Sequence, residues 1–387
     1  MQTTPYWLDY SYEPRPALDA DIRADVCVIG AGVGGLSCAR ELARRGLDAV
    51  VLEARTVASG ASGRNGGFLL AGGAPFHVDA RERWGHEPAR RLYARTVEVQ
   101  EEVIALAAEL GAGPYVRKVG SLRLATSDEE AEAVRKHVDA LREDGFAAEY
   151  VARAELEAPL RGIGLAGCLV EHDAALQPAR WIRELAKSAE DAGARIYEGT
   201  RAQPGSPVVA EGSFSVDAAH VVVATDGGLP TLVPETAATT KSRRLHMIAT
   251  APLGETVLSN LIYARYGFEY VQQQPDGRIA LGGFSDLDGP SSYTDVEEGN
   301  PAVWERLDAY LHDDLGLEQA DITHRWVGIV GFSEDERPFA GEVREGLYGL
   351  GGYSGHGNLI GFIAGRAVAE HIATGASADL ELLRLAN

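Results

Sequence analysis

The chain has 387 residues, 45% of them hydrophobic, which is enough to bury the cores of two or three domains. It carries 36 Lys and Arg against 57 Asp and Glu, a formal net charge of −21, and a surface of that sign repels the phosphate backbone of nucleic acids. We therefore expect no nucleic-acid partner. The charge is typical of a solvated acidic surface; the alternative is that it steers a cationic substrate.

The cysteines predict a reduced environment. Cys27, Cys38 and Cys168 form no CxxC pair and stand among apolar residues, as expected for packing positions in a cytoplasmic protein. The segment before Asp25 lacks the charged and then apolar pattern of an export signal, and no apolar run approaches about eighteen residues, so no membrane partner is expected. No His or Cys cluster has metal-ligand spacing, and no metal is predicted.

The first regular elements in chain order are a strand over 26–29, a glycine turn, a helix over 36–45 and a strand over 48–53. This order is typical of a βαβ unit with a parallel sheet. Glycine is dense over 59–73, which predicts a loop. Amphipathic helices follow over 87–110 and 128–144, the second opening with the capping box of Ser127 and Glu130.

An alternating strand over 121–126 interrupts the βαβ order and indicates an inserted domain. A helix beginning at Pro178 and a buried strand over 219–225 return to the first domain. Strand-like runs over 243–251, 261–273 and 278–284 predict an antiparallel sheet, after which Asn300 caps a helix. A strand over 347–350, a glycine-rich loop and a helix over 358–374 close the chain. The predicted fold class is α/β.

Residues 30–35 read GAGVGG and satisfy the G-x-G-x-x-G pattern between a strand and a helix. Gly30 permits the tight turn, Gly32 lets the backbone approach a pyrophosphate, and Gly35 lets the helix pack on the strand. The N–H groups at the start of the helix favour an anion there. Glu53 ends the second strand, where a carboxylate accepts hydrogen bonds from an adenosine ribose. This motif predicts a dinucleotide without distinguishing NAD from FAD.

Two further glycine-rich segments make the distinction: SGASGRNGG over 59–67 and GYSGHGN over 352–358. Together with the first motif they resemble the FAD-dependent oxidoreductases of the D-amino acid oxidase family, over about residues 25–375, and are most similar to its γ-glutamylputrescine oxidase-like branch. The resemblance implies a Rossmann-type FAD-binding domain over 1–75, 151–235 and 326–387. It also implies an inserted antiparallel-sheet substrate domain over 76–150 and 236–325.

The resemblance implies that the loop over 60–67 passes along the flavin and that the helix after the second cluster starts near its pyrimidine edge. Asp226 stands where the family usually has Asn. No Cys or His occupies 54–68 and no Cys occupies 326–341, so FAD is expected to be held without a covalent bond. The implied cofactor-binding residues are Gly30, Gly32, Gly34, Gly35, Glu53, Ala54, Arg55, Ser62, Arg64, Asn65, Gly66, Gly67, Ala202, Thr225, Gly227, Trp326, Gly355, His356, Gly357, Asn358 and Leu359.

The implied activity is oxidation of the C–N bond of a small amine or amino acid by hydride transfer to flavin N5, with O2 as the acceptor giving H2O2. A dehydrogenase with another acceptor, and a non-catalytic or RNA-modifying FAD protein, are the alternatives. The candidate catalytic residues are His356, Arg265 and Tyr353. For His356, the alternative to substrate contact is packing beside the ring.

The predicted sheet also carries groups that suit a substrate. Strand alternation directs some of Arg243, Arg244 and Arg265 toward a carboxylate and the others toward water, and the same alternatives of aromatic cage or sheet packing hold for Tyr263, Tyr266 and Tyr270. Sarcosine-oxidising relatives have Lys where this chain has Leu359. The resemblance therefore implies a larger amine as substrate, unless Arg265 or Arg244 replaces the missing cation.

Overall fold

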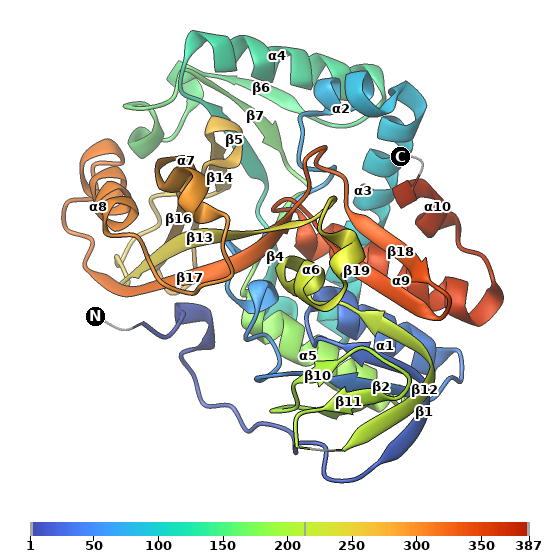
Figure 1. Cartoon of the computed structure of the whole chain (residues 1–387). Helices are drawn as coiled ribbons and strands as arrows, with labels where there is room; N and C mark the ends of the chain where they lie inside the picture. The colour runs from blue at the N-terminus through green and yellow to red at the C-terminus, as the bar shows by residue number, and fades with distance from the viewer. Residues whose placement is uncertain (1–2, 213, 385–387) are drawn as a thin grey trace.

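The computed structural model describes residues 3–212 and 214–384, and two large sheets dominate it (Figure 1). The first sheet has a parallel core. Its strands, in spatial order, are β9 (Arg195–Tyr197), β2 (Ala49–Leu52), β1 (Ile22–Ile29), β12 (Ser215–Val223) and β19 (Leu347–Gly351). Antiparallel strands β18 (Phe339–Arg344), β11 (Val208–Ala210) and β10 (Ala202–Gln203) extend it.

Helices cover the first sheet because the apolar runs of its strands are buried on both faces. Residues of α1 (Val33–Arg44), α3 (His86–Glu109), α5 (Pro178–Asp191) and α9 (Gly357–Thr374) share one apolar core with β1 and β2. A second cluster covers the opposite face, from Ile29, Leu52 and Val223. The predicted βαβ unit and the closing strand and helix are confirmed.

The second sheet contains eight strands in the order β17 (Ile322–Phe332), β13 (Lys241–Thr250), β16 (Ile279–Gly283), β15 (Glu269–Gln273), β14 (Leu261–Ala264), β5 (Ser121–Ala125), β7 (Ala166–Val170) and β6 (Glu149–Ala152). The three runs predicted to form an antiparallel sheet do pair antiparallel with one another. The strand β5, from outside those runs, joins the sheet by pairing with β14 in parallel. The run over 261–273 is also two strands, since Arg265 and Tyr266 adopt positive φ angles of 45° and 55° and reverse the chain.

The remaining elements surround these sheets. Strands β3 (Phe68–Leu69), β8 (Ala174–Leu176) and β4 (Val116–Lys118) form a small third sheet. Helices α2 (His77–Trp84) and α4 (Asp128–Glu143) lie at the end of the second sheet that contains β6 and β7 (Figure 1). The shorter helices are α6 (Leu229–Leu232), α7 (Ser285–Asp288), α8 (Pro301–Ala309) and α10 (Ala378–Arg384).

The division between the sheets differs from the predicted boundaries. Strands β6 and β7 fall mostly within the predicted FAD segment 151–235, yet they pair with each other and β7 pairs with β5 in the second sheet. Strand β17 crosses the predicted boundary at 325/326. Pairing between segments distant in sequence decides which sheet a strand belongs to. The pattern of local elements does not encode that pairing. Residues 1–2 and 385–387 of the predicted segments lie outside the described residues.

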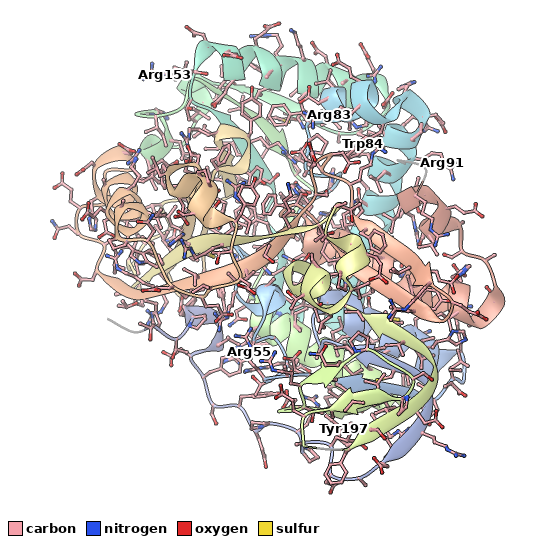
Figure 2. The ribbon with its side chains drawn as sticks, in the orientation of Figure 1. Arg55, Arg83, Trp84, Arg91, Arg153 and Tyr197 are labelled. Atoms are coloured by element: carbon pink, nitrogen blue, oxygen red, sulfur yellow. The ribbon has the colours of Figure 1, made fainter. Side chains whose placement is uncertain are left out.

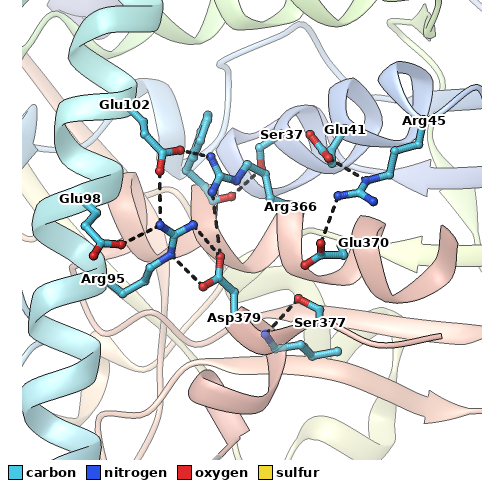
Figure 3. A network of polar contacts seen from close by, with 12 residues as sticks. Ser37, Glu41, Arg45, Arg95, Glu98, Glu102, Arg366, Glu370, Ser377 and Asp379 are labelled. Carbon is cyan, nitrogen blue, oxygen red and sulfur yellow. Dashed lines mark hydrogen bonds and ion pairs between the residues drawn. The ribbon is translucent and has the colours of Figure 1, made fainter. Parts of the chain in front are cut away.

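An ion-pair network fixes the position of α9 (Figure 3). Arg95 of α3 donates to both carboxylate oxygens of Asp379 in α10, at 2.8 and 3.0 Å. Arg366 of α9 pairs with Glu102 of α3. Ser37 of α1 donates its hydroxyl to the carbonyl oxygen of Phe362 in α9 at 3.1 Å. Among the residues described, no helix is long and apolar enough to cross a membrane.

Candidate active site

One cavity of about 620 Å³ lies between the first and second sheets, and the three glycine-rich segments meet on its wall. Its lining includes Gly32, Val33 and Gly34 from the first segment, Ala61, Ser62, Arg64, Asn65 and Gly66 from the second, and Tyr353, Ser354, Gly355, Gly357 and Asn358 from the third. Strands β13, β14 and β15 form the opposite wall. Segments more than 300 residues apart in sequence thus form one site.

The first segment ends β1 and begins α1. Gly30 has a φ of +107°, and a Cβ atom there would lie 2.7 Å from the carbonyl oxygen of Ala224, so the turn requires glycine. A Cβ atom on Gly35 would lie 2.0 Å from the carbonyl oxygen of Gly30, in agreement with close packing of helix on strand. The Ser62 hydroxyl accepts the Val33 N–H at 3.0 Å, which joins the second segment to the helix start.

Glu53 lies at the end of β2 beside the first segment. Its carboxylate accepts the N–H of Ala31 and the N–H of Arg55, both at 2.9 Å. Arg55 itself is exposed and lies between the first sheet and β17 (Figure 2). Both Arg55 and the half-buried Arg64 pair with Glu297, at 2.8 and 2.7 Å. The carboxylate of Glu297 therefore bridges two of the predicted cofactor residues.

Residues 59–67, here called the flavin loop, are tied to the start of α9. The side-chain amides of Asn65 and Asn358 donate to each other at 3.2 and 3.1 Å, and Asn358 also donates to the Phe68 carbonyl oxygen at 2.9 Å. Gly67 has a φ of +75°, and a Cβ atom there would lie 2.2 Å from Nε2 of Gln272. The amide pair was not predicted, because nothing in the sequence links two Asn residues so far apart.

His356 precedes α9 and is buried, with its ring 6.1 Å edge-on from the ring of Tyr263. Both ring nitrogens lack a hydrogen-bond partner among the described residues. Burial, helped by the nearby positive charge of Arg123, lowers the pKa of His356 to about 3. The imidazole is therefore neutral near pH 7 and a weak base. It packs against Tyr263 rather than lining the cavity.

Asp226 has a φ of 47°, a conformation that Asn and Asp tolerate better than most residues. Its carboxylate accepts the N–H groups of Gly331 at 2.8 Å and Gly352 at 3.0 Å, joining the ends of β17 and β19. Burial raises the pKa of Asp226 to about 6, and these backbone N–H groups oppose that shift. The residue that departs from the family pattern thus holds the cavity wall together.

One row of side chains crosses the second sheet, and its two tyrosines line the cavity. Residues paired across neighbouring strands share a face, and the register places Tyr270, Tyr263 and Arg123 side by side on β15, β14 and β5. Tyr263 and Tyr270 line the cavity. Arg123 is 6% exposed, and its guanidinium carbon lies 5.5 Å from the ring of Phe76 and 5.3 Å from that of Tyr263. Alternation over 121–126 was the signal that could have singled out Arg123.

The three sheet arginines that the sequence singled out have different surroundings. Arg265 pairs with Glu269 at 2.9 Å and Asp286 at 2.7 Å, and Arg244 pairs with Asp288 at 2.9 Å. Both are therefore already paired with carboxylates of the chain itself. Arg243 instead lines the cavity, and its Nε donates only to the Ser292 hydroxyl, at 3.2 Å.

The remaining residues that the sequence singled out lie on several different elements around the site. The Tyr353 ring packs between α1 and α9, so that a Cβ atom on Gly34 would lie 3.0 Å from its hydroxyl. The Leu359 side chain is buried in the apolar core and does not line the cavity. Ala202 lies on β10, Gly227 packs against β17, and Ala54 and Thr225 follow β2 and β12. Trp326 donates to the Arg64 carbonyl oxygen at 2.9 Å.

The cavity suits FAD by the chemistry of its walls. Nε of Arg64, which lines the cavity, is buried without a hydrogen-bond partner among the described residues. The same holds for Oγ1 of Thr225 and both ring nitrogens of His356, which are sequence neighbours of the lining residues Ala224 and Gly355. A buried polar atom without a partner is costly, so these groups fit a polar ligand that supplies one. A Cβ atom on Gly32 would lie 2.9 Å from the Ser62 hydroxyl, and α1 and α9 both direct their N-termini to the cavity wall.

Comparisons with known proteins agree with this geometry. The family described as FAD dependent oxidoreductase (DAO) matches residues 25–371. The chain is 29% identical to a probable oxidoreductase OrdL of Rhizobium meliloti strain 1021, over 98% of this chain and 90% of that protein. It is 29% identical to the gamma-glutamylputrescine oxidoreductase of Escherichia coli K12, over 93% of this chain and 86% of that protein.

Solved structures show the same fold. Glycine oxidase of Geobacillus kaustophilus superimposes with a TM-score of 0.77 at 23% identity, covering 92% of this chain and 96% of that one. L-proline dehydrogenase of P. horikoshii gives 0.76 at 21% identity, with 94% and 96% covered. The family match confirms the resemblance inferred from the glycine-rich segments. The chain therefore belongs to the DAO family of FAD-dependent oxidoreductases, and FAD is its cofactor.

Proposed function

We propose that the protein oxidises the C–N bond of an amine or amino acid that carries a carboxylate, with O2 as the final electron acceptor. The observation that carries the proposal is the position of Arg243 on the cavity wall that faces the flavin loop, where this cation has no carboxylate partner among the described residues. Two relatives named for such substrates, a gamma-glutamylputrescine oxidoreductase and a glycine oxidase, support the substrate class.

Arg243 is held ready for an anion. Its guanidinium carbon lies 5.4 Å from the ring of Tyr293 and 5.2 Å from that of Phe332, and these rings restrict its motion without neutralising its charge. Its neighbour across the sheet, Val330, is apolar and also lines the cavity. A carboxylate at this place gains a charge-assisted hydrogen bond, which orients the rest of the substrate.

When bound, FAD supplies the acceptor for the hydride that leaves the substrate carbon. The protein's part is to orient the amine and exclude water. Tyr263 and Tyr270 place aromatic rings on the cavity wall, where they pack against the carbon chain of the amine and exclude water. The neutral amine loses one hydride and becomes an iminium cation, which water hydrolyses to a carbonyl compound and an ammonium or alkylammonium ion. The hydride's two electrons and proton, with one proton from water, convert O2 to H2O2.

We assign no base to this reaction. The pKa of His356 is held at about 3, so its imidazole does not retain a proton at neutral pH. We propose further that the first sheet and its helices bind FAD and that the second sheet binds the substrate, because the glycine-rich segments belong to the first and Arg243 and the tyrosines to the second.

Anaerobic mixing with a panel of amines tests the proposal. Glycine, sarcosine, D-alanine, putrescine and γ-glutamylputrescine are compared for bleaching of the flavin absorbance, and air is then admitted. A substrate should bleach the flavin, and O2 should restore the colour with one H2O2 per turnover. Bleaching that O2 does not reverse would indicate a dehydrogenase, and no bleaching by any amine would indicate a non-catalytic or RNA-modifying role.

The substitution Arg243→Gln separates carboxylate recognition from the chemical step. Loss of a hydrogen bond to a charged group costs about 1.5–3 kcal/mol, so the apparent Kd for a carboxylate-bearing substrate should rise about ten- to a hundred-fold. Reduction by putrescine, which has no carboxylate, should be unaffected. Equal losses for both classes would mean that Arg243 does not contact the substrate carboxylate.

A further inference from the structure

Two tryptophan side chains hold consecutive carbonyl groups of the flavin loop. Nε1 of Trp326 donates to the carbonyl oxygen of Arg64 at 2.9 Å, and Nε1 of Trp7 donates to the carbonyl oxygen of Asn65 at 2.8 Å. The two indoles meet edge to face, with ring centroids 6.3 Å apart and an interplanar angle of 77°. Both carbonyl groups therefore point toward the same side of the loop.

In a trans peptide the N–H group points opposite to the carbonyl group. The peptide whose oxygen is held by Trp326 carries the N–H of Asn65, and the peptide held by Trp7 carries the N–H of Gly66. Neither N–H has an acceptor anywhere in residues 3–212 and 214–384. Asn65 and Gly66 both line the cavity, so this pair of donors belongs to the cofactor site.

Trp7 is well placed to do this although it lies far away in sequence. Its side chain is fully buried and packs in the same apolar core as α1 and α9. The Gln177 side chain donates to the Trp7 carbonyl oxygen at 2.9 Å, and its own oxygen accepts the N–H of Arg180 as the N-cap of α5. The leader segment is thereby fixed to the first sheet's helices and presents its indole to the flavin loop.

We propose that Trp7 and Trp326 are positioning residues of the redox site, which hold the Arg64 and Asn65 carbonyl groups so that the N–H groups of Asn65 and Gly66 face the ring of bound FAD. Reduced flavin carries negative charge, and hydrogen-bond donors fixed toward that charge stabilise it more than the oxidised form. The two indoles thus tune the reduction potential of the cofactor without touching it. The N-terminal leader is accordingly part of the redox site.

The substitutions Trp7→Phe and Trp326→Phe test the proposal, because each keeps a buried aromatic ring and removes only the N–H donor and some volume. The full-length, FAD-loaded variants are equilibrated with redox dyes. We expect the ratio of reduced to oxidised flavin at a fixed potential to fall about tenfold, which for a two-electron couple is a shift of about 30 mV. The visible flavin band should shift as well, and the affinity for FAD should fall.

Trp181→Phe is the matched control. Trp181 is 1% exposed and packs in the same core as Trp7, but its indole nitrogen has no hydrogen-bond partner among the described residues. The control should lower thermal stability and leave the potential unchanged. The proposal is overturned if Trp7→Phe and Trp326→Phe keep the wild-type potential, or if Trp181→Phe shifts it equally.

A variant that does not fold is replaced by one of the same shape. Trp7→benzothienylalanine retains the bicyclic ring and substitutes sulfur for the N–H group, so it removes the donor without leaving a cavity. A tenfold change in the flavin ratio is again expected, and an unchanged ratio in this variant overturns the role of Trp7 in the redox site.

Discussion

At the scale of single residues, a substitution at Gly32 gives the sharpest test of where FAD binds. A side chain at Gly32 would meet the Ser62 hydroxyl, with 2.9 Å between that oxygen and the new Cβ atom, and would occupy the approach to the start of α1. Gly32→Val should therefore abolish FAD binding. Flavin absorbance per protein after purification measures this.

The control for that experiment is Gly162→Val. Gly162 has open space, with the nearest atom 3.8 Å from an added Cβ, and lies outside the cavity wall. This variant should bind FAD fully. A normal flavin content in Gly32→Val would show that the first glycine segment does not bind the pyrophosphate.

Asp226 makes a prediction about pH. Its pKa is about 6 in the folded protein because of burial, above the value of about 3.9 in an unfolded chain, so the folded state binds the proton more tightly. Its contribution to stability is therefore fully present below about pH 4 and is lost as the pH rises through 6. Titration of this carboxyl should lower the free energy of unfolding by roughly 1–2 kcal/mol between pH 5 and pH 7.

The measurement is the free energy of unfolding of the wild type and of Asp226→Asn at pH 5 and pH 7. The variant cannot titrate at this position, so its stability relative to the wild type should improve from pH 5 to pH 7. The NH2 group of the Asn side chain would also face one of the two backbone N–H donors. The variant should therefore be less stable than the wild type at pH 5. Parallel pH profiles would contradict the raised pKa.

Residues in strands show how far the sequence alone could go. Alternation places Arg243 and Arg244 on opposite faces of β13. Which face meets the cavity depends on the pairing of β13 with β16 and β17, and which arginine is neutralised depends on Asp288, 44 residues beyond Arg244. The glycine motifs, by contrast, encode their own backbone conformation, and Gly30 and Gly35 have the roles predicted for them.

At the scale of elements, α9 makes the next prediction, because its N-terminus faces the cavity and a polar network fixes its other contacts. Asp379 is 18% exposed and receives two hydrogen bonds from Arg95 (Figure 3). Asp379→Asn should lower the free energy of unfolding by about 1.5–3 kcal/mol, because a half-buried, charge-assisted pair is lost. Urea unfolding of the FAD-loaded protein measures this loss.

Glu98→Gln provides the comparison within the same network. Glu98 also pairs with Arg95, but its side chain is 64% exposed, so this substitution should change stability little. Neither variant should alter the rate of flavin reduction, since neither residue lines the cavity. A loss of reduction rate in Asp379→Asn would show that the network does more than fix the helix.

The reversal between β14 and β15 shows what patterns of elements miss. The run over 261–273 is apolar and aromatic enough to predict one strand, yet Arg265 and Tyr266 take left-handed conformations that non-glycine residues rarely adopt. The reversal brings Tyr263 and Tyr270 side by side on the cavity wall. No turn residue marks it except Gly267, whose φ is +93°. The aromatic wall was therefore open to two interpretations from the sequence.

At the scale of the whole molecule, the charge of the cavity wall differs in sign from the net charge of the chain. The net charge of −21 left cationic steering as an alternative, yet the cavity wall carries Arg243, which has no carboxylate partner in residues 3–212 and 214–384. Most arginines elsewhere in the described chain pair with acidic side chains, so an excess of carboxylates at the surface coexists with a local cation in the site. Composition predicts the outer surface and says little of a cavity that distant segments build.

The final prediction concerns how FAD is held and whether it couples the unfolding of the two sheets. The cavity wall contains neither Cys nor His among the described residues, and Cys27, Cys38 and Cys168 are all buried, so FAD should be held without a covalent bond. Acid denaturation followed by filtration should then leave the yellow colour in the filtrate, and colour retained with the protein would contradict this. The proposed FAD site lies between the two sheets, and a ligand that binds only the folded chain stabilises it, so added FAD should stabilise the apoprotein by about 2.7 kcal/mol at a hundred times its Kd. AMP lacks the flavin ring that is proposed to reach the second sheet. If the second sheet then unfolds separately, AMP at a hundred times its own Kd should stabilise the apoprotein less than FAD does. A single melting transition with FAD and two with AMP would locate the coupling between the sheets in the flavin ring, whereas identical unfolding with either ligand would place it in the protein alone.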